Sequence, residues 1–415
     1  MINELLLSSF PKVLDLTSSE HLELLETTVD SLMDKFETVD DISKVENEFI
    51  NKNDDSYIFV LLVLKLLKSR FYMSKIDKQV TVSIIFAVYN EHNRIKTKNE
   101  HPHGEDFLKR KISQLEWFFK NKKNFNWEII VVDDGCPNKS GEIAKEIINS
   151  NNLNDKAKVI FLEKAINDKL DIVENLTSTK DSQKGGSISY GMWYAAAKQT
   201  KKETENHIII YTDADLSTHL GQVGLLINPI LKQNKTIAIG SRREVDSTVI
   251  KKGTRNNRGK LFIYLWKRLI PNLGNIIDTQ CGFKAFKKEV AVKIIDNLIE
   301  KKFAFDIELL LKAELLNKNT IEKVAIAWID SEEASTTTDL QPYLPMLKSI
   351  AKMYKKYFPM NKKSEEFYKF INSLDEESFI KLIENIPTSI LEKDPSEFTK
   401  FDKINALDLE NIIKS

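Results

Sequence analysis

The segment VSIIFAVYNE, residues 82–91, is an apolar run that ends at three polar residues, Tyr89, Asn90 and Glu91. β-Branched and aromatic residues favour a strand, and an apolar run without alternation is typical of a strand buried on both faces of a parallel sheet. In an open α/β sheet the ligand binds at the carboxyl ends of the strands. We therefore expect the polar end of this segment to face a ligand.

Two later apolar runs end in the same way: IIVVDDG ends at Asp133 and Asp134, and HIIIYTDAD ends at Asp213 and Asp215. Each junction alone is explained by a turn, where Asp and Asn are common. Together, the three strand ends indicate one polar crevice with the hydrogen-bond acceptors that the base and ribose of a nucleotide need. The sequence therefore predicts a site for a sugar nucleotide.

Asp213 and Asp215 lie two residues apart, directly after an apolar run. Alternate side chains of a strand point the same way, so we expect both carboxylates on one face. Two such oxygen ligands suit Mg²⁺ or Mn²⁺ that is shared with phosphate oxygens. For this pair taken alone, a helix-capping or turn role is the alternative.

Two further motifs carry positive charge. Lys184 begins the segment KGGS, whose glycines let the backbone approach a ligand, and we expect its ammonium group to meet donor phosphates. Arg242 lies in GSRR and is followed by Arg255 and Arg258, and guanidinium groups bind phosphate bidentately. A linker and a basic surface loop are the respective alternatives.

Apolar runs alternate with helical patterns between residues 79 and 335, which predicts an α/β domain with a doubly wound, mostly parallel sheet. Residues 1–78 and 336–415 are predicted to be helical N- and C-terminal extensions, which we expect to pack or to contact a protein partner. The expected strands are 80–88, 127–132, 158–162, 207–211 and 236–239, and the expected crossover helices are 107–120, 141–149, 188–198 and 221–232.

The composition limits the partners. The chain of 415 residues carries 61 Lys and Arg against 61 Asp and Glu, so no net charge attracts it to nucleic acid, and we expect no nucleic-acid partner. It has two cysteines, no secretory signal pattern and no apolar run of the roughly 20 residues that span a bilayer. We predict a cytoplasmic protein, with peripheral contact at the inner face of the membrane as an option.

Three segments outside these motifs invite other interpretations. Residues 91–106, which hold three histidines, and residues 163–183 are long loops of the kind that often form lids. The histidines lack a metal-ligand spacing, so we interpret them as part of a solvated loop. Residues 342–358 form an amphipathic pattern with a basic face, which fits either a helix on a membrane surface or a packed helix with solvated lysines.

Eight motifs together carry a resemblance: VSIIFAVYNE, IIVVDDG, KGG, YTDAD, GSRR, DTQCGFKAF, FDIELL and VAIAWID. Their order and spacing resemble family 2 glycosyltransferases with the GT-A fold. The segments IDTQCGFKAF and FDIELL are most similar to the dolichyl-phosphate β-glucosyltransferase branch and its polyprenyl-phosphate relatives. The resemblance covers residues 80–330, and the two helical ends fall outside it.

The resemblance implies residue roles. The nucleoside would be held by Ala87, Tyr89, Glu91 and Asp133; the ribose, diphosphate and metal by Asp213 and Asp215; the acceptor phosphate by Arg242, Arg255 and Arg258; and the sugar by Asp278 and Gln280, with Asp306 and Glu308 nearby. Ala87 departs from the family, which commonly has Pro there, and Cys136 stands where a small hydroxyl residue is usual.

The implied reaction is an inverting, metal-dependent transfer of a sugar from a nucleoside diphosphate, with UDP-glucose the favoured donor and Mg²⁺ or Mn²⁺ as cofactor. A polyprenyl phosphate acceptor is already anionic and needs no strong base. A soluble or glycan hydroxyl needs a carboxylate to take its proton, and Asp278 and Asp306 are the candidates; Arg242 then loses its role. A non-catalytic scaffold that binds sugar nucleotides is the alternative from another class.

Overall fold

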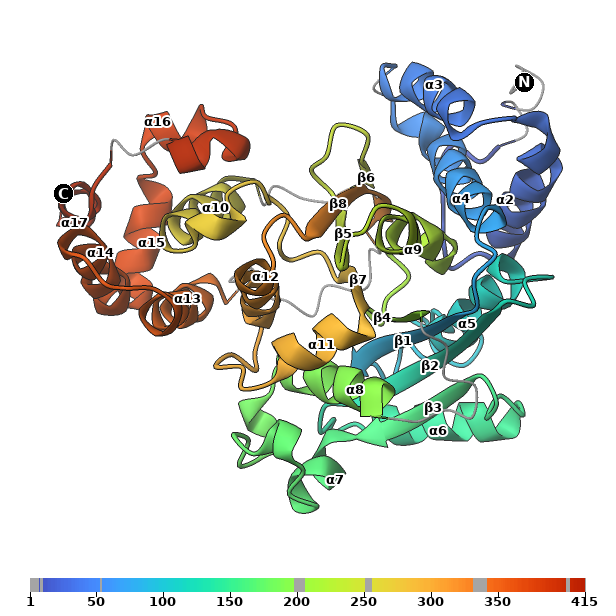
Figure 1. Ribbon diagram of the computed structural model, residues 1–415, viewed down its shortest axis with the longest axis horizontal. Coiled ribbons are helices and arrows are strands. Elements are labelled where there is room, and N and C mark those ends of the chain that lie inside the picture. Colours follow the sequence, from blue (N-terminus) through green and yellow to red (C-terminus); the bar gives the residue numbers. More distant parts are fainter. Residues whose placement is uncertain are drawn as a thin grey trace. The chain divides into compact units, whose positions relative to one another are not determined.

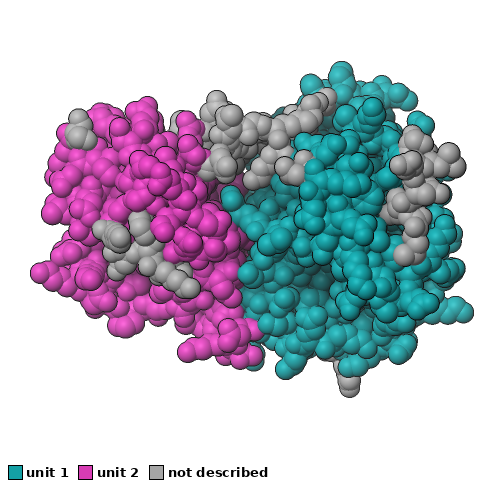
Figure 2. Space-filling view, turned by 90° about the horizontal axis from the view of Figure 1, so that it is seen from above, with its two compact units in different colours: residues 1–251, 281–296, 320–334 teal, residues 252–280, 297–319, 335–415 magenta. Residues whose placement is uncertain are grey.

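The computed structural model describes residues 7, 10–52, 54–197, 206–250, 256–330, 342–400 and 404–414. The chain forms two compact units, each assembled from separate stretches of sequence (Figure 2). Unit 1 comprises residues 1–251, 281–296 and 320–334, and unit 2 comprises residues 252–280, 297–319 and 335–415. The sequence division at residues 78 and 335 stays a prediction, because the units follow contacts in space rather than single stretches.

Unit 1 is built on a mixed sheet with the strand order β3-β2-β1-β4-β7-β5-β8 in the described residues. All neighbouring strands are parallel except β7, which runs antiparallel to both β4 and β5. The strands are β1 (Val80–Val88), β2 (Phe125–Asp133), β3 (Ala157–Phe161), β4 (Asn206–Thr212), β5 (Ile237–Ser241), β7 (Phe283–Lys287) and β8 (Ile321–Ala325); β6 (Thr248–Ile250) and β9 (Ala327–Ile329) pair separately.

Helices cover both faces of this sheet (Figure 1). On one face α8 (Gly185–Ala197) packs so closely that a Cβ at Gly191 would lie 2.6 Å from Ile85 of β1, and α11 (Lys288–Ile295) lies beside it. The opposite face shares one apolar core with α4 (Ile58–Ser74), α5 (Phe107–Phe118), α6 (Ser140–Ser150) and α9 (Val223–Lys232). The predicted fold class, an α/β domain with a doubly wound, mostly parallel sheet and helical ends, is confirmed.

The N-terminal helices belong to unit 1. They are α2 (Ser19–Leu32), which Ser18 caps, α3 (Val39–Ile50) and α4, whose apolar residues pack against α2, α3 and α9. Glu46 of α3 is fully buried and forms ion pairs with two lysines of α4, Lys65 at 2.9 Å and Lys68. Two ammonium groups therefore meet one buried carboxylate where α3 packs on α4.

Unit 2 is helical. Its helices are α10 (Asn256–Leu269), α12 (Phe305–Leu316), α13 (Tyr343–Tyr357), α14 (Lys362–Ser373), α15 (Glu376–Glu384), α16 (Thr388–Leu391) and α17 (Ala406–Lys414). Glu308 of α12 accepts hydrogen bonds from the backbone N–H of Ile299 (2.9 Å) and Glu300 (2.8 Å) and from the Tyr357 hydroxyl (2.7 Å). This buried carboxylate joins α12 to the end of α13.

The basic helix of residues 342–358 corresponds to α13. Its apolar residues Leu347, Ile350 and Met353 are fully buried inside unit 2, while Lys352 and Lys355 are exposed. The packed interpretation with solvated lysines therefore describes this helix. Among the residues that the structure describes, no helix has the length and apolar character needed to cross a bilayer.

Candidate functional site

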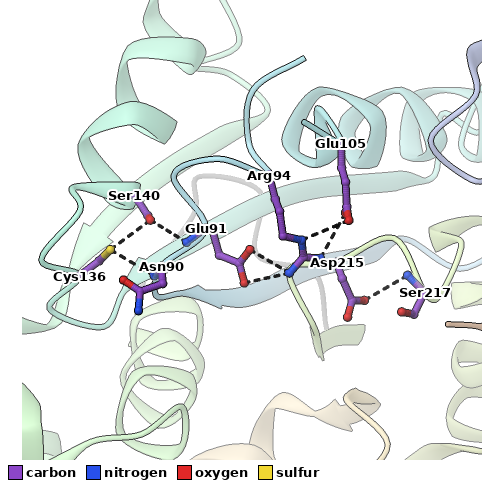
Figure 3. Close-up of polar contacts among 8 residues, drawn as sticks. All are labelled: Asn90, Glu91, Arg94, Glu105, Cys136, Ser140, Asp215 and Ser217. Carbon is purple, nitrogen blue, oxygen red and sulfur yellow. Dashed lines mark hydrogen bonds and ion pairs between the residues drawn. The ribbon is translucent and has the colours of Figure 1, made fainter. Parts of the chain in front are cut away.

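The end of β1 turns sharply at Asn90, whose φ is +60°. Its N–H donates to Cys136 Sγ at 3.2 Å, and the next N–H, that of Glu91, donates to Ser140 Oγ at 2.9 Å (Figure 3). Cys136 and Ser140 are themselves 3.1 Å apart. The end of β1 is therefore tied to the loop after β2, and the unusual thiol acts as the acceptor. Tyr89, at the outside of the turn, is 51% exposed and presents its ring to solvent.

Asp133 ends β2 and is mostly buried. Its carboxylate accepts the backbone N–H groups of Gly135 (2.9 Å), Cys136 (3.1 Å) and Gly141 (2.8 Å). Burial nevertheless raises the pKa of this carboxyl above its ordinary value. Asp133 thus shapes the loop and the start of α6 around the predicted nucleoside site, and its direct contact with a base stays a prediction.

Asp134 holds the KGGS segment. Its carboxylate accepts the Lys184 N–H at 2.8 Å and the Ser187 hydroxyl at 2.6 Å. Lys184 has a φ of +81°, a left-handed conformation that is uncommon outside glycine. The residue immediately before α8 is therefore fixed to the end of β2, and its side chain is directed from there toward the end of β4.

Lys184 and Asp213 form an ion pair. Asp213 also donates its backbone N–H to the carbonyl of Gly282 at 3.0 Å. Burial by itself would raise the pKa of Asp213, but Lys184, with the charges of Arg242 and Lys284, holds that pKa below its ordinary value. The first acid of the DAD motif is therefore ionised and carries a lysine partner.

Asp215 accepts the Ser217 N–H at 3.1 Å (Figure 3). Burial, and then the neighbouring charge of Asp213, raise the pKa of Asp215, whereas the charges of Arg94 and Lys111 oppose this shift. Lys111 of α5 is fully buried, its Nζ has no hydrogen-bond partner among the residues that the structure describes, and burial lowers its pKa to about 8. The second acid of the motif is therefore partly buried, and two cations partly neutralise its charge.

Arg94 connects the two ends of the loop that follows β1. It donates to Glu91 Oε2 at 2.9 Å and to Glu105 Oε2 at 3.2 Å, and all three side chains are largely buried (Figure 3). Burial raises the pKa of Glu91 to about 7, against the opposing charge of Arg94. Backbone hydrogen bonds from Glu105 to Arg94 and from Asp106 to Lys96, both 2.8 Å, close the loop on itself. Residues 91–106 therefore form a loop whose two ends are held together by ion pairs and backbone hydrogen bonds.

The carboxylate ligands at the end of β4 suit a divalent cation. Asp213 and Asp215 provide two carboxylates, and a Cβ at Gly282 would fall 2.3 Å from both oxygens of Asp213, so only glycine leaves this carboxylate its space. No group of three or more His, Cys, Asp and Glu side chains that could hold a metal occurs in the described part of the chain. The protein would thus supply two ligands, leaving positions for phosphate and water, as Mg²⁺ commonly requires.

The remaining predicted residues divide between the units. Ala87 lies half-buried in β1, and Arg242 follows β5 with its guanidinium 5.3 Å from the ring of Trp328. Asp278, Gln280, Arg258 and Asp306 belong to unit 2, so their approach to the unit 1 residues stays a prediction. Asp278 and Asp306 are buried, at 5% and 2% exposed. Arg255 lies outside the described residues.

Sequence reasoning missed the supporting charges. Arg94, Glu105 and Lys111 received no role, and neither did Asp134 as an anchor for Lys184. One signal was available for Lys111, because it shares a predicted helix with Phe107 and Leu115 on a face that is otherwise apolar. A lysine on an apolar helix face indicates either that the buried face was assigned wrongly or that the lysine is buried and has a functional role.

Comparison with known proteins agrees with the motifs. Residues 83–294 match Glycosyl transferase family 2. The chain is 28% identical over 264 residues to dolichyl-phosphate beta-glucosyltransferase ALG5D of Trichomonas vaginalis, covering 61% of this chain and 67% of that protein. It is 28% identical over 259 residues to the human dolichyl-phosphate beta-glucosyltransferase, covering 60% and 68%.

Among solved structures, glucosyl-3-phosphoglycerate synthase from Mycobacterium tuberculosis, crystallised with Mn²⁺, uridine diphosphate and glucosyl-3-phosphoglycerate, is similar with a TM-score of 0.46 and 16% identity, over 71% of this chain and 85% of that chain. The family match spans half of the chain and includes the ends of β1, β2 and β4 together with Gly282. The chain therefore belongs to glycosyl transferase family 2, and it is a glycosyltransferase.

Proposed function

We propose that this enzyme transfers glucose from UDP-glucose, with inversion and with Mg²⁺ or Mn²⁺, to a polyprenyl phosphate. One observation supports the donor site. Hydrogen bonds and an ion pair connect polar groups at the ends of the neighbouring strands β2, β1 and β4, along one edge of the sheet. The lipid phosphate acceptor rests on the relatives, which are dolichyl-phosphate beta-glucosyltransferases.

The residues have separate tasks in this proposal. The turn at Tyr89 to Glu91 and the loop after Asp133 hold the nucleoside. Hydrogen bonds join the two segments, and the turn carries the exposed Tyr89, on whose ring a base can stack. Asp213 and Asp215 hold the divalent cation, which when bound neutralises charge on the departing nucleoside diphosphate. Gln280 and Asp278 line the sugar pocket, as the resemblance implies.

No side chain of the enzyme attacks the sugar in this proposal. The acceptor is the nucleophile, so the protein must position it. A phosphate acceptor is anionic at neutral pH and attacks the anomeric carbon directly, displacing the diphosphate in one step. Arg242, which is held against Trp328, supplies a guanidinium that can bind two phosphate oxygens at once. In this arrangement Asp278 and Asp306 need not remove a proton.

The test supplies radiolabelled UDP-glucose, Mg²⁺ and a yeast or bacterial membrane extract, and follows the label into an organic phase. Acid-labile label in that phase is the expected result. Label that stays in water while UDP is released would instead assign the acceptor to a soluble or glycan hydroxyl, with Asp278 or Asp306 as base. Absence of UDP release from every extract would overturn the transfer itself.

Asp215→Asn is the matched active-site variant, because it removes one charge from a side chain of nearly the same size. Loss of transfer with an unchanged melting temperature is expected. Asp168→Asn is the control, since Asp168 makes an exposed ion pair with Lys164 on α7 (Leu162–Asn167). Full activity in Asp215→Asn would remove this residue from the site.

A further inference from the structure

Main-chain conformation and hydrogen bonds position both residues of the ion pair between Lys184 and Asp213. Lys184 is fixed by its left-handed backbone and by the hydrogen bond to Asp134. Asp213 is fixed by its hydrogen bond to the carbonyl of Gly282, whose missing side chain leaves room for the carboxylate. The pair is partly open to solvent, with the lysine side chain 27% and the aspartate side chain 35% exposed. A ligand can therefore reach it.

This pair places an ammonium group on a carboxylate that the proposed metal site also needs. Two cations that share one carboxylate repel each other, by several kcal/mol at about 4 Å near a protein surface. A divalent ion therefore cannot bind the Asp213 carboxylate at full strength while Lys184 stays paired with it. The structure thus holds the site in a form in which the lysine and a metal compete.

The geometry points to Lys184 as a displaceable counter-cation: it occupies Asp213 in the ligand-free enzyme, and it moves to a phosphate oxygen of the sugar nucleotide when donor and divalent cation bind together. This inference rests on the proposed function. Lysine suits such a transfer, because its ammonium is a compact charge with three donors on a flexible stem. The fixed backbone of Lys184 keeps the stem anchored while its tip changes partner.

A coupling between ligands follows. Without a nucleotide, metal binding must leave Lys184 without its carboxylate, so the metal alone binds weakly. With a nucleotide diphosphate present, Lys184 gains a phosphate partner, and metal affinity rises beyond what chelation by the diphosphate provides. Such mutual enhancement is a coupling free energy and must appear equally in both binding constants.

The experiment measures Mn²⁺ affinity of the full-length chain by electron paramagnetic resonance, with and without UDP. In Lys184→Met, Mn²⁺ alone should bind at least about tenfold more tightly than in the wild type, because the competing charge is gone. The enhancement by UDP should shrink in the same variant. Lys164→Met, which breaks the exposed pair with Asp168, is the control and should change neither value.

Adding Asp213→Asn to Lys184→Met should abolish the gain, since it removes the carboxylate for which the lysine and the metal compete. Lys184→Arg provides a second route if the methionine variant folds poorly, because a guanidinium bound to Asp213 through two hydrogen bonds should weaken Mn²⁺ binding below the wild type. Equal or weaker Mn²⁺ binding by folded Lys184→Met would overturn the inference alone. Failure of the wild type to bind Mn²⁺ even with UDP would overturn the proposed metal site as well.

Discussion

Gly282 lies against the carboxylate of Asp213 so closely that a Cβ at position 282 would fall 2.3 Å from Oδ1 and from Oδ2. Gly282 directly precedes β7 and Asp213 directly follows β4, and the Asp213 N–H donates to the Gly282 carbonyl. The glycine of the motif DTQCGF thus fixes the position of the first acid of the motif DAD.

Gly282→Ala should therefore displace the Asp213 carboxylate. We expect turnover to fall by about a hundredfold, because a displacement near 1 Å in a reacting site has effects of that size, and stability to fall by about 1–3 kcal/mol from overpacking. Enzyme assays and thermal melts measure both. Gly259→Ala on α10, where the nearest atom would be 3.8 Å away at Tyr343 Oη, is the control. Wild-type turnover in Gly282→Ala would separate Asp213 from the reaction.

Arg94→Met should leave Glu91 and Glu105 as buried carboxylates without their shared cation. The expected loss is about 3–5 kcal/mol of unfolding free energy, the usual cost of removing one partner from a buried ion pair. The KM for UDP-glucose should also rise, since Glu91 ends the β1 turn. Lys109→Met breaks a partly exposed pair with Asp106 (3.3 Å) and should cost less than about 1 kcal/mol. Urea unfolding compares them, and equal losses would show that the Arg94 pairs contribute no more than surface pairs.

Glu46→Gln should destabilise the N-terminal helices, because it leaves Lys65 and Lys68 without their buried counter-charge. We expect a loss of about 3–5 kcal/mol in urea unfolding. The matched control is Lys44→Met, which breaks an exposed pair with Asp41 (3.4 Å) on the same helix. If both variants cost the same, the ion pairs of Glu46 do not stabilise the packing of α3 on α4.

Glu26 of α2 supplies a pH prediction. Burial, and then the charge of Asp30, raise its pKa from 4.5 to about 7. Because the folded state holds the proton more tightly than the unfolded state, this group favours folding below pH 4.5, and its contribution is lost as the pH rises toward 7. Glu26→Gln should thus gain stability relative to the wild type over that range, by roughly 1–3 kcal/mol at pH 8.

Melting temperatures between pH 4.5 and pH 8 measure this difference. Glu48→Gln removes the same charge from an exposed position on α3 and corrects for the change in net charge. A constant difference between Glu26→Gln and the wild type across the whole range would show that Glu26 has the same proton affinity in the folded and unfolded states.

The sequence predicted five of the six mutually parallel strands in the described sheet, because each of these five is an apolar run of suitable length. The run at residues 80–88 matches β1 residue for residue, and the four other expected strands differ from β2, β3, β4 and β5 by at most two residues at either end. Strand β8, which is parallel to β5, was not predicted, and neither was the antiparallel strand β7. Its sequence, FKAFK, alternates weakly, and its place depends on the free edges of β4 and β5, which are set by tertiary structure.

The site shows the same division. The strand-end acids are local features, so Asp133, Asp213 and Asp215 were found from apolar runs that stop. The link from Asp134 to Lys184 spans 50 residues, and the pair of Lys184 with Asp213 spans 29. Such partners are chosen by packing, and no local pattern encodes them. Residues 91–106, the loop that Arg94 fastens, were predicted to form a lid from their length alone, because the contacts within the loop cannot be read from the sequence.

The antiparallel strand also bears on how the chain is made. β7 lies between β4, which ends at Thr212, and β5, which begins at Ile237, yet it comes from residues 283–287. During synthesis β1 to β4 can pair as they emerge, but β4 keeps one open edge until some 70 further residues have left the ribosome, and open strand edges recruit other chains. The most aggregation-prone species of this enzyme should therefore be nascent chains that stop just short of Lys287.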